Sequence, residues 1–417
     1  MKTKSIVLSN GVTVINVENK NSLTAFVQFI FRAGAKHETE NNIGVAHFLE
    51  HMLFQGTQTR SAMDISLLAS SLAMDLNAET GFSNTKYQVD CLSEDVPKAF
   101  EILSDMMQNS IFDEKEIRKE KRVILEEKRT FLEDDQQKDI ILFDTTSYAD
   151  KYLEYDVIGR IKDIKKINRE MLLSFYNKFY TSSNLIVVTT GGISIEETIE
   201  LIERHLTSLP IGEINPNPLR NYKGGTFLGR KTKKSCNIRL GFNVDNNADF
   251  FACKLLNIIL GGQASSRLYF NLREKKGLVY DTSSMFMATK PSMFVVEAIA
   301  CSENIPAVID GVCEELRLLK TTLVSDNDLA WAKKNYLANI ARGFESCNIV
   351  SCIVSGYFLT TGKIFDIEEI TKSINAISKE DIRVAANKAF NDKLTYFINA
   401  QVKNKPSYDE VCNMLNG

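Results

Sequence analysis

The sequence lacks the features that mark several large classes of protein. Its 417 residues hold 50 lysines and arginines against 53 acidic residues, so the net charge of -3 gives no general attraction to nucleic acid. No uncharged apolar run reaches the roughly 18 residues that a membrane-spanning helix requires, and the N-terminus has no apolar stretch of signal-peptide length. We therefore expect no nucleic-acid partner, no membrane association and a cytoplasmic location.

The eight cysteines include no C-x-x-C pair, which excludes a zinc ribbon and a thioredoxin-type redox motif. They are expected to be reduced thiols, as in a reducing compartment, and the abundance of Lys, Ile and Asn suits a bacterial cytosol. Apolar residues make up 44% of the chain and charged residues 25%, which is typical of a soluble globular protein. The length predicts two or three domains.

Proline is scarce, but three of the seven prolines fall between positions 210 and 218, in a polar stretch that continues to a Gly-Gly pair. This pattern predicts a linker at 213–225. It would separate a domain of residues 1–212 from a second of residues 226–417, and each half is long enough to bury its own core.

The two halves of nearly equal length suggest a duplication. Sliding the chain by 210 positions places residues 168–180 over 378–391 and aligns an Asn-Lys pair in the two segments. Both segments begin with an N-cap residue, show helical apolar spacing and precede a β-rich run. Two homologous domains would explain this match, although two ordinary helix-to-strand connections could produce it by coincidence.

The first half begins with alternating apolar residues on both sides of Asn10-Gly11, which is a strong hairpin signal. A third alternating run covers Thr24 to Phe31, and long helical patterns then begin near positions 46, 62, 95 and 113. Strands followed by runs of helices predict an α+β fold, in which each domain is a largely antiparallel sheet packed with helices.

Histidine is rare in this chain: His37, His47, His51 and His205 are the only four. His47 and His51 are four residues apart in GVAHFLEHMLFQGT, so on a helix both rings leave the same face, with Glu50 beside them. This is the geometry of a metal site. The alternative is a pair of unrelated surface histidines, which chance seldom places in an H-x-x-E-H pattern when a chain has so few.

A catalytic zinc site requires a third protein ligand and one open position. His37 and His205 are possible ligands, but the helical stretch 113–135 offers a better one. On a helical wheel its buried arc is bounded by Val123 and Leu125, and this arc contains Glu127 and Glu120 but not Glu126. A carboxylate on an apolar face needs a cation or a proton. Periodicity therefore selects Glu127 as the third ligand, with Glu120 in support.

The HFLEH motif followed by a glutamate-rich helix resembles the inverted-motif (HxxEH) zinc peptidase family of pitrilysin, insulin-degrading enzyme and mitochondrial processing peptidase. The chain resembles a short bacterial member of this family, similar to the processing peptidase β subunit. The resemblance covers essentially the whole chain. It implies one Zn²⁺ per chain held by His47, His51 and Glu127, with Glu120 as the supporting acid.

The same resemblance assigns substrate-binding residues. Asn77 and Ala78 are similar to the family's Asn-Ala segment on the strand beside the metal, and Arg273 and Tyr280 match its Arg and Tyr pair. From the residues alone, Arg273 and Tyr280 would be interpreted as surface or packing residues. The Gly-Gly pair at 261–262 lacks the spacing of a phosphate-binding loop and is better explained as a turn into a helix.

The expected function is that of a zinc endopeptidase acting on a peptide or unfolded segment bound as an extended strand. Glu50 would act as general base for a zinc-activated water. Acidic residues near Glu127 could favour basic peptides. Because the chain resembles half of the family's long members, a homodimer forming a clamshell chamber is expected, with Arg273 and Tyr280 of one chain facing the zinc of the other. The alternatives are a non-catalytic assembly subunit of the same fold and a metal-dependent hydrolase of a non-peptide substrate.

Overall fold

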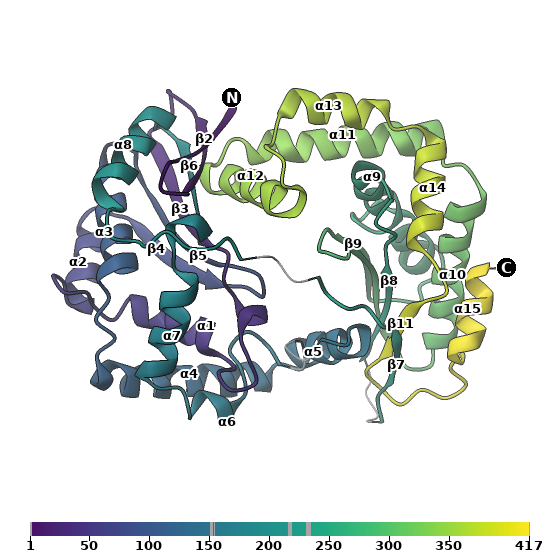
Figure 1. The fold of residues 1–417 in the computed structure, drawn as a ribbon. Coiled ribbons are helices and arrows are strands. Elements are labelled where there is room, and N and C mark those ends of the chain that lie inside the picture. The colour runs from purple at the N-terminus through teal and green to yellow at the C-terminus, as the bar shows by residue number, and fades with distance from the viewer. Residues whose placement is uncertain (1, 151–152, 154, 216–218, 231–234, 417) are drawn as a thin grey trace. The chain divides into compact units, whose positions relative to one another are not determined.

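The structure is a computed structural model that describes residues 2–150, 153, 155–215, 219–230 and 235–416. The chain folds into two compact units (Figure 1). Unit 1 comprises Met1–Asp135, Tyr155–Pro218 and Arg342–Asp366, and unit 2 comprises Gln136–Glu154, Leu219–Ala341 and Ile367–Gly417. No helix in the described ranges is long and apolar enough to cross a membrane.

The described part of unit 1 contains a six-stranded sheet. In order across the sheet the strands are β1 (Thr3–Val7), β2 (Thr13–Glu18), β6 (Leu185–Gly191), β3 (Thr24–Phe31), β5 (Thr85–Leu92) and β4 (Asp75–Thr80). Neighbouring strands are antiparallel except for β2 and β6. The predicted hairpin around Asn10-Gly11 is confirmed as the β1–β2 pair. The strand β4 lies at one edge of the sheet, which leaves its outer backbone groups without a neighbouring strand among the described residues.

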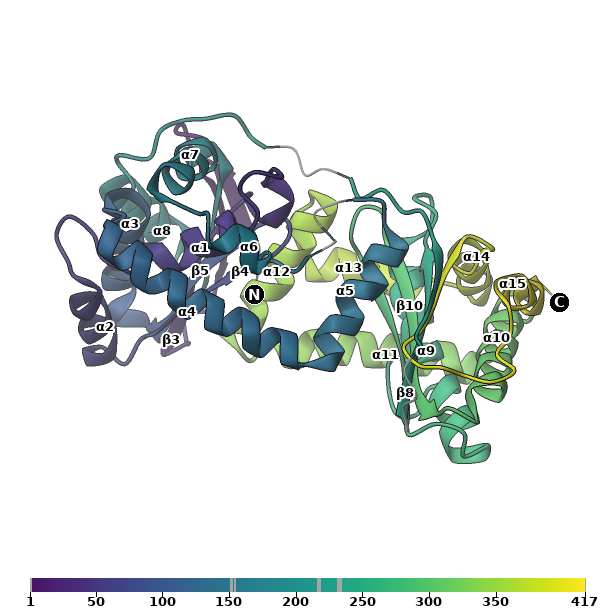
Figure 2. The same cartoon turned by 90° about the horizontal axis from the view of Figure 1, so that it is seen from below.

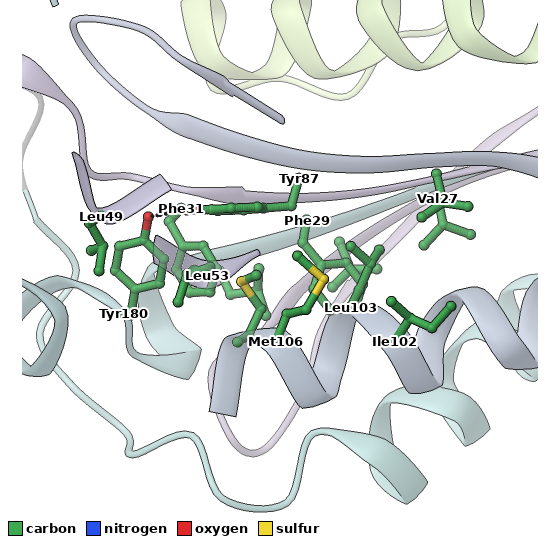
Figure 3. Close-up of a cluster of buried hydrophobic side chains, with 14 of the residues drawn as sticks. Val27, Phe29, Phe31, Leu49, Leu53, Tyr87, Ile102, Leu103, Met106 and Tyr180 are labelled. Carbon is green, nitrogen blue, oxygen red and sulfur yellow. Dashed lines mark hydrogen bonds between the residues drawn. The ribbon is translucent and has the colours of Figure 1, made fainter. Parts of the chain in front are cut away.

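Helices cover both faces of this sheet. Those of unit 1 are α1 (Val45–Leu53), α2 (Ala62–Ser71), α3 (Val96–Asn109), α4 (Glu114–Glu133), α6 (Ile161–Ile164), α7 (Arg169–Phe179), α8 (Ile195–His205) and α12 (Cys347–Thr361). The helices expected near positions 46, 62, 95 and 113 are thus confirmed as α1 to α4. The main core lies between the sheet and α1 and α3, where Phe29, Phe31 and Met106 are fully buried (Figure 3). In Figure 2, α4 runs alongside α1, against which it packs.

The described part of unit 2 contains a five-stranded sheet of β7 (Gly225–Leu228), β11 (Leu394–Ile398), β8 (Ser235–Asn243), β10 (Met293–Cys301) and β9 (Asp281–Met287), in that order. Only β7 and β11 are parallel. Its helices are α5 (Asp135–Ser147), α9 (Phe250–Leu260), α10 (Ile305–Thr321), most of α11 (Asp326–Gly343), α13 (Ile367–Ala376), α14 (Lys379–Ala389) and α15 (Tyr408–Asn416), with a π-helical segment at Tyr269–Lys275.

The two sheets have the same architecture. The order β2-β6-β3-β5-β4 in unit 1 corresponds to β7-β11-β8-β10-β9 in unit 2. The helices α7 and α14 begin 210 positions apart, and each has a side-chain N-cap, from Asn168 and Ser378 respectively. The predicted α+β class with two similar, largely antiparallel domains is therefore confirmed.

Each unit also contains a helix from the other half of the chain. α12 packs on the unit 1 sheet, on the face opposite α3, where Ser351 donates a hydrogen bond to Gln28 (Figure 1). α5 packs on the unit 2 sheet, where Asp139 accepts hydrogen bonds from Asn237 and Asn399. The two units therefore differ from the predicted division into 1–212 and 226–417, because Gln136–Glu154 belongs to unit 2 and Arg342–Asp366 belongs to unit 1. Gly225, placed in the predicted linker, begins β7, and residues 216–218 of that linker lie outside the described residues.

Candidate metal centre

The helix α1 carries the H-x-x-E-H motif, and its start is fixed by two features. Gly44 precedes the helix at φ 86°, and a side chain there would bring a Cβ atom 2.5 Å from the Ile158 carbonyl oxygen, so only glycine fits. The Glu38 carboxylate accepts hydrogen bonds from the backbone N–H groups of Gly44 and Ala46, each at 2.9 Å. These bonds satisfy donors that a helix N-terminus leaves unpaired.

His47 and His51 lie one turn apart on α1, with their ring centroids 4.7 Å apart. Glu127 of α4 reaches both rings: its Oε1 is 3.6 Å from His47 Nε2, and its Oε2 is 3.5 Å from His51 Nε2. One ligand atom from each of the three residues lies within 4.8 Å of the others, and no other such group occurs in the described ranges. The sequence prediction that these three residues come together is thus matched by the geometry.

The donor set fits a zinc ion. Ligands at about 2.1 Å from a tetrahedral ion lie about 3.4 Å from one another. The two nitrogen-to-oxygen distances of 3.6 and 3.5 Å are close to this separation. Two imidazoles and one carboxylate are also a ligand set found in catalytic zinc sites, which keep a fourth position open.

Glu127 is more exposed than the helical wheel predicted, with 42% of its side chain accessible to solvent. The buried face of α4 consists of Ile117, Glu120, Ile124 and Lys128, so it is narrower than the arc predicted from the sequence and stops short of Glu127. Val123, used to bound that arc, is also exposed. Glu127 therefore lies at the edge of the buried face, where its carboxylate can meet the rings and remain partly hydrated.

Glu120 is buried and touches the second histidine. Its Oε2 lies 3.2 Å from His51 Nδ1, the ring nitrogen that does not face Glu127. A carboxylate on the far nitrogen fixes the orientation and the tautomer of a ligating ring. This contact corresponds to the supporting position expected for Glu120.

Burial and neighbouring charges act on the two histidines in opposite ways. Burial is the largest influence on His47 and, with the nearby His51, lowers its pKa to about 4. Burial also acts to lower the pKa of His51, but hydrogen bonds to Glu120 and Glu127 outweigh it and raise the value to about 9. The hydrogen bond from His51 lowers the pKa of Glu127. The site thus concentrates negative charge around two rings, as a cation site requires.

Glu50 lies on α1 between the histidines and is partly buried. Desolvation raises its pKa, against the opposing effects of a hydrogen bond from Thr80 and of His51. A carboxyl group with a raised pKa beside a candidate metal site is suited to proton transfer. The hydrogen bond from Thr80 was not predicted from the sequence.

The structure places the remaining candidate residues elsewhere. Asn77 and Ala78 lie on the edge strand β4. In unit 2, Arg273 and Tyr280 are exposed, with the Arg273 guanidinium carbon 6.0 Å from the Tyr280 ring centre. His37 and His205 do not belong to the metal-ligand group. His37 Nδ1 accepts a hydrogen bond from the Gly34 N–H, and His205 ends α8.

Family models match both halves of the chain. Residues 13–158 match the model described as Insulinase (Peptidase family M16), and residues 166–336 match the model described as Peptidase M16 inactive domain. The candidate metal ligands fall in the first of these ranges. The second range contains Arg273 and Tyr280.

Known proteins are similar over nearly the whole chain. An uncharacterized zinc protease of Rickettsia felis is 32% identical and aligns with 93% of this chain and 95% of its own. The mitochondrial-processing peptidase subunit beta of Saccharomyces cerevisiae is 27% identical, with coverage of 94% and 89%. The crystal structure of a protease from Helicobacter pylori has the same fold, with a TM-score of 0.85, 22% identity and coverage of 96% and 99%. The chain therefore belongs to the insulinase family of peptidases, family M16.

Proposed function

We propose that the protein is a zinc-dependent endopeptidase, in which His47, His51 and Glu127 hold one Zn²⁺ per chain. The observation that carries this proposal is the convergence of His47 Nε2, His51 Nε2 and the Glu127 carboxylate from two separate helices. Family membership supports it, because several relatives are named zinc proteases.

Zinc held by His47, His51 and Glu127 would supply a Lewis acid, which lowers the pKa of water and polarises a carbonyl group. The Glu50 carboxylate accepts the proton of the attacking water and passes it to the leaving amine, as a general base and then a general acid. Glu120 keeps the His51 ring oriented during this exchange through its contact with Nδ1.

The substrate in this proposal is a peptide or an unfolded segment that adds to the outer edge of β4. The edge position of β4 supports this mode, since an extended chain can hydrogen-bond to free strand backbone groups. Asn77 and Ala78 lie in this strand. Thr80 ends the strand and hydrogen-bonds to Glu50, so a substrate on this edge would lie near Glu50. Exposed acidic residues such as Glu126 and Glu133 would favour basic peptides, and equal cleavage of acidic and basic peptide libraries would remove that preference.

We also propose that the active assembly is a homodimer, with Arg273 and Tyr280 of one chain contacting substrate at the zinc of the other. Mixing two inactive variants tests this arrangement. A mixed dimer of E50Q and R273A chains would contain one complete site, so activity should reappear on mixing. An absence of recovery together with a monomeric sedimentation mass would contradict the homodimer.

The alternative is a non-catalytic assembly subunit of the same fold. The model described as an inactive domain matches residues 166–336, and the candidate ligands His47, His51 and Glu127 all lie before that range. A purely structural role gives no reason for a buried carboxylate such as Glu120 to orient one ring of this cluster.

Activity and metal content measured together test the proposed function. Wild-type protein should bind one zinc per chain and cleave an internally quenched basic peptide, and E50Q should retain zinc but lose nearly all turnover. E127Q should lose zinc, while E126Q, which changes the exposed neighbouring glutamate, should retain it. Full turnover by E50Q, or zinc-free wild-type protein, would contradict the proposal.

A further inference from the structure

The Thr80 hydroxyl donates a hydrogen bond to Glu50 Oε2. Within the described part of the chain it is the one side chain that hydrogen-bonds to Glu50. Thr80 is itself buried and is the last residue of β4, whereas Glu50 lies on α1. The bond therefore joins the edge strand of the sheet to the helix that carries the candidate metal ligands.

The backbone on which Thr80 lies is held in place by the adjoining turn. Thr80 pairs with Thr85 of β5 at the end of the β4–β5 ladder. Beyond it, the Gly81 and Phe82 carbonyl groups accept hydrogen bonds from the Ala35 and Lys36 N–H groups at 3.2 and 3.0 Å. The Thr80 hydroxyl is thus presented from a fixed backbone, and a bond to it restricts the position of its partner.

Glu50 has no comparable restraint of its own. A glutamate side chain has three rotatable bonds, and in the described structure only the Thr80 hydroxyl fixes its far end. A hydrogen bond from a hydroxyl to a carboxylate is charge-assisted and stronger than one between neutral groups. Because Thr80 engages Oε2, the other oxygen, Oε1, stays available to accept a proton.

We propose that Thr80 is a positioning residue, which holds the Glu50 carboxylate in the orientation needed for proton transfer. This inference rests on the proposed peptidase function and extends it to a residue outside the group of candidate metal ligands. Threonine suits this role better than serine, because its branched Cβ limits the rotation of the hydroxyl. A misplaced catalytic group loses rate in the chemical step rather than affinity for substrate.

Two substitutions of Thr80 distinguish the effect of its hydroxyl group on activity from the effect of its side-chain shape. T80V keeps the branched shape but removes the donor, and T80S keeps the donor but loses a methyl group. We expect T80V to lower kcat by roughly tenfold to a hundredfold, with KM and zinc content unchanged. T80S should retain most of the wild-type kcat. A matched control is T85V, which removes the hydroxyl of the cross-strand neighbour, whose bond goes to the Ala33 carbonyl group instead.

A double substitution tests whether Thr80 acts through Glu50. In an E50Q background T80V should cause no further loss of residual turnover, because the group that Thr80 positions has already been disabled. An equal fractional loss in both backgrounds would overturn the proposal, as would a full wild-type kcat in T80V. Equal loss of kcat in T80V and T80S, with both proteins folded, would also overturn it.

Crystal structures of metal-free wild-type, T80V and T80S proteins give a readout that does not depend on activity. The Glu50 carboxylate should keep one orientation in wild type and T80S, and should turn away or become disordered in T80V. An unchanged Glu50 in T80V would overturn the positioning role even if the protein is a peptidase. If wild-type protein cleaves no peptide, the proposed function fails, and these structures still decide whether Thr80 orients Glu50.

Discussion

Lys128, the residue after Glu127 in α4, forms a buried ion pair with Asp156. Asp156 also accepts a hydrogen bond from the Ile158 N–H at 2.8 Å, and the Ile158 carbonyl group lies against Gly44 at the start of α1. One short segment therefore links the two helices that carry the candidate ligands. This link between α1 and α4 requires no metal ion.

The ion pair predicts a large effect of D156N on stability. Removing one partner leaves the Lys128 ammonium buried without compensation, which should lower the free energy of unfolding by about 3–5 kcal/mol. Chemical denaturation of the metal-free protein would measure the loss. R129M, which breaks the exposed pair with Glu126, should change stability by no more than about 1 kcal/mol. Similar losses in the two variants would contradict the role given to Asp156.

Glu120 should control metal affinity without being a ligand. E120Q removes the negative charge beside His51 Nδ1, so zinc should bind about 10- to 100-fold more weakly. Competition with a chromogenic chelator measures this affinity. E133Q, on the exposed side of the same helix, serves as the control and should bind zinc as wild type does. An unchanged dissociation constant in E120Q would show that orientation of His51 does not depend on Glu120.

Glu38 should make the metal-free protein less stable as the pH rises. Burial raises its pKa to about 8 from an ordinary value of 4.5, against the hydrogen bonds from Gly44 and Ala46, with Asp156 adding to the rise. Between these pH values the folded state holds a proton that the unfolded chain has lost, so stability falls with increasing pH. In E38Q this contribution is absent, and melting temperature should fall less from pH 5 to 8.5. Parallel curves for the two proteins would contradict the assignment.

A fragment of residues 1–212 should not form a stable native domain. It lacks α12, whose Val350 and Val354 are buried in unit 1 and whose Ser351 contacts Gln28. The fragment would expose an apolar sheet face, so it should bind a hydrophobic dye and unfold without a sharp transition. A fragment that unfolds cooperatively and binds no dye would show that α12 is dispensable.

The sequence was sufficient to predict most local features, because these depend on short-range patterns. The hairpin at Asn10-Gly11, the strand from Thr24 and the helices α1 to α4 followed from turn residues and apolar periodicity. The pairing of His47 with His51 was equally predictable, since residues four apart on a helix share a face. The strict repeat of 210 positions between α7 and α14 likewise followed from their N-cap residues and apolar spacing.

Features that depend on distant segments were not predictable in the same way. The exchange of α5 and α12 between units leaves no local signal, because each helix would have a similar apolar pattern against either sheet. The burial of Lys128 depends on its ion pair with Asp156, which lies in another segment of the chain, and no local pattern in α4 indicates that partner. Thr80 was also missed, because nothing in a strand sequence indicates which helix its hydroxyl will meet.

The placement of α12 has a consequence for synthesis on the ribosome. Roughly 150 residues separate the end of α8, which completes the first-half part of unit 1, from the end of α12. At about 5–20 residues per second, translation of that interval takes about 8–30 s. During this time the nascent unit 1 sheet has one apolar face uncovered, which makes it a substrate for chaperones and vulnerable to premature association.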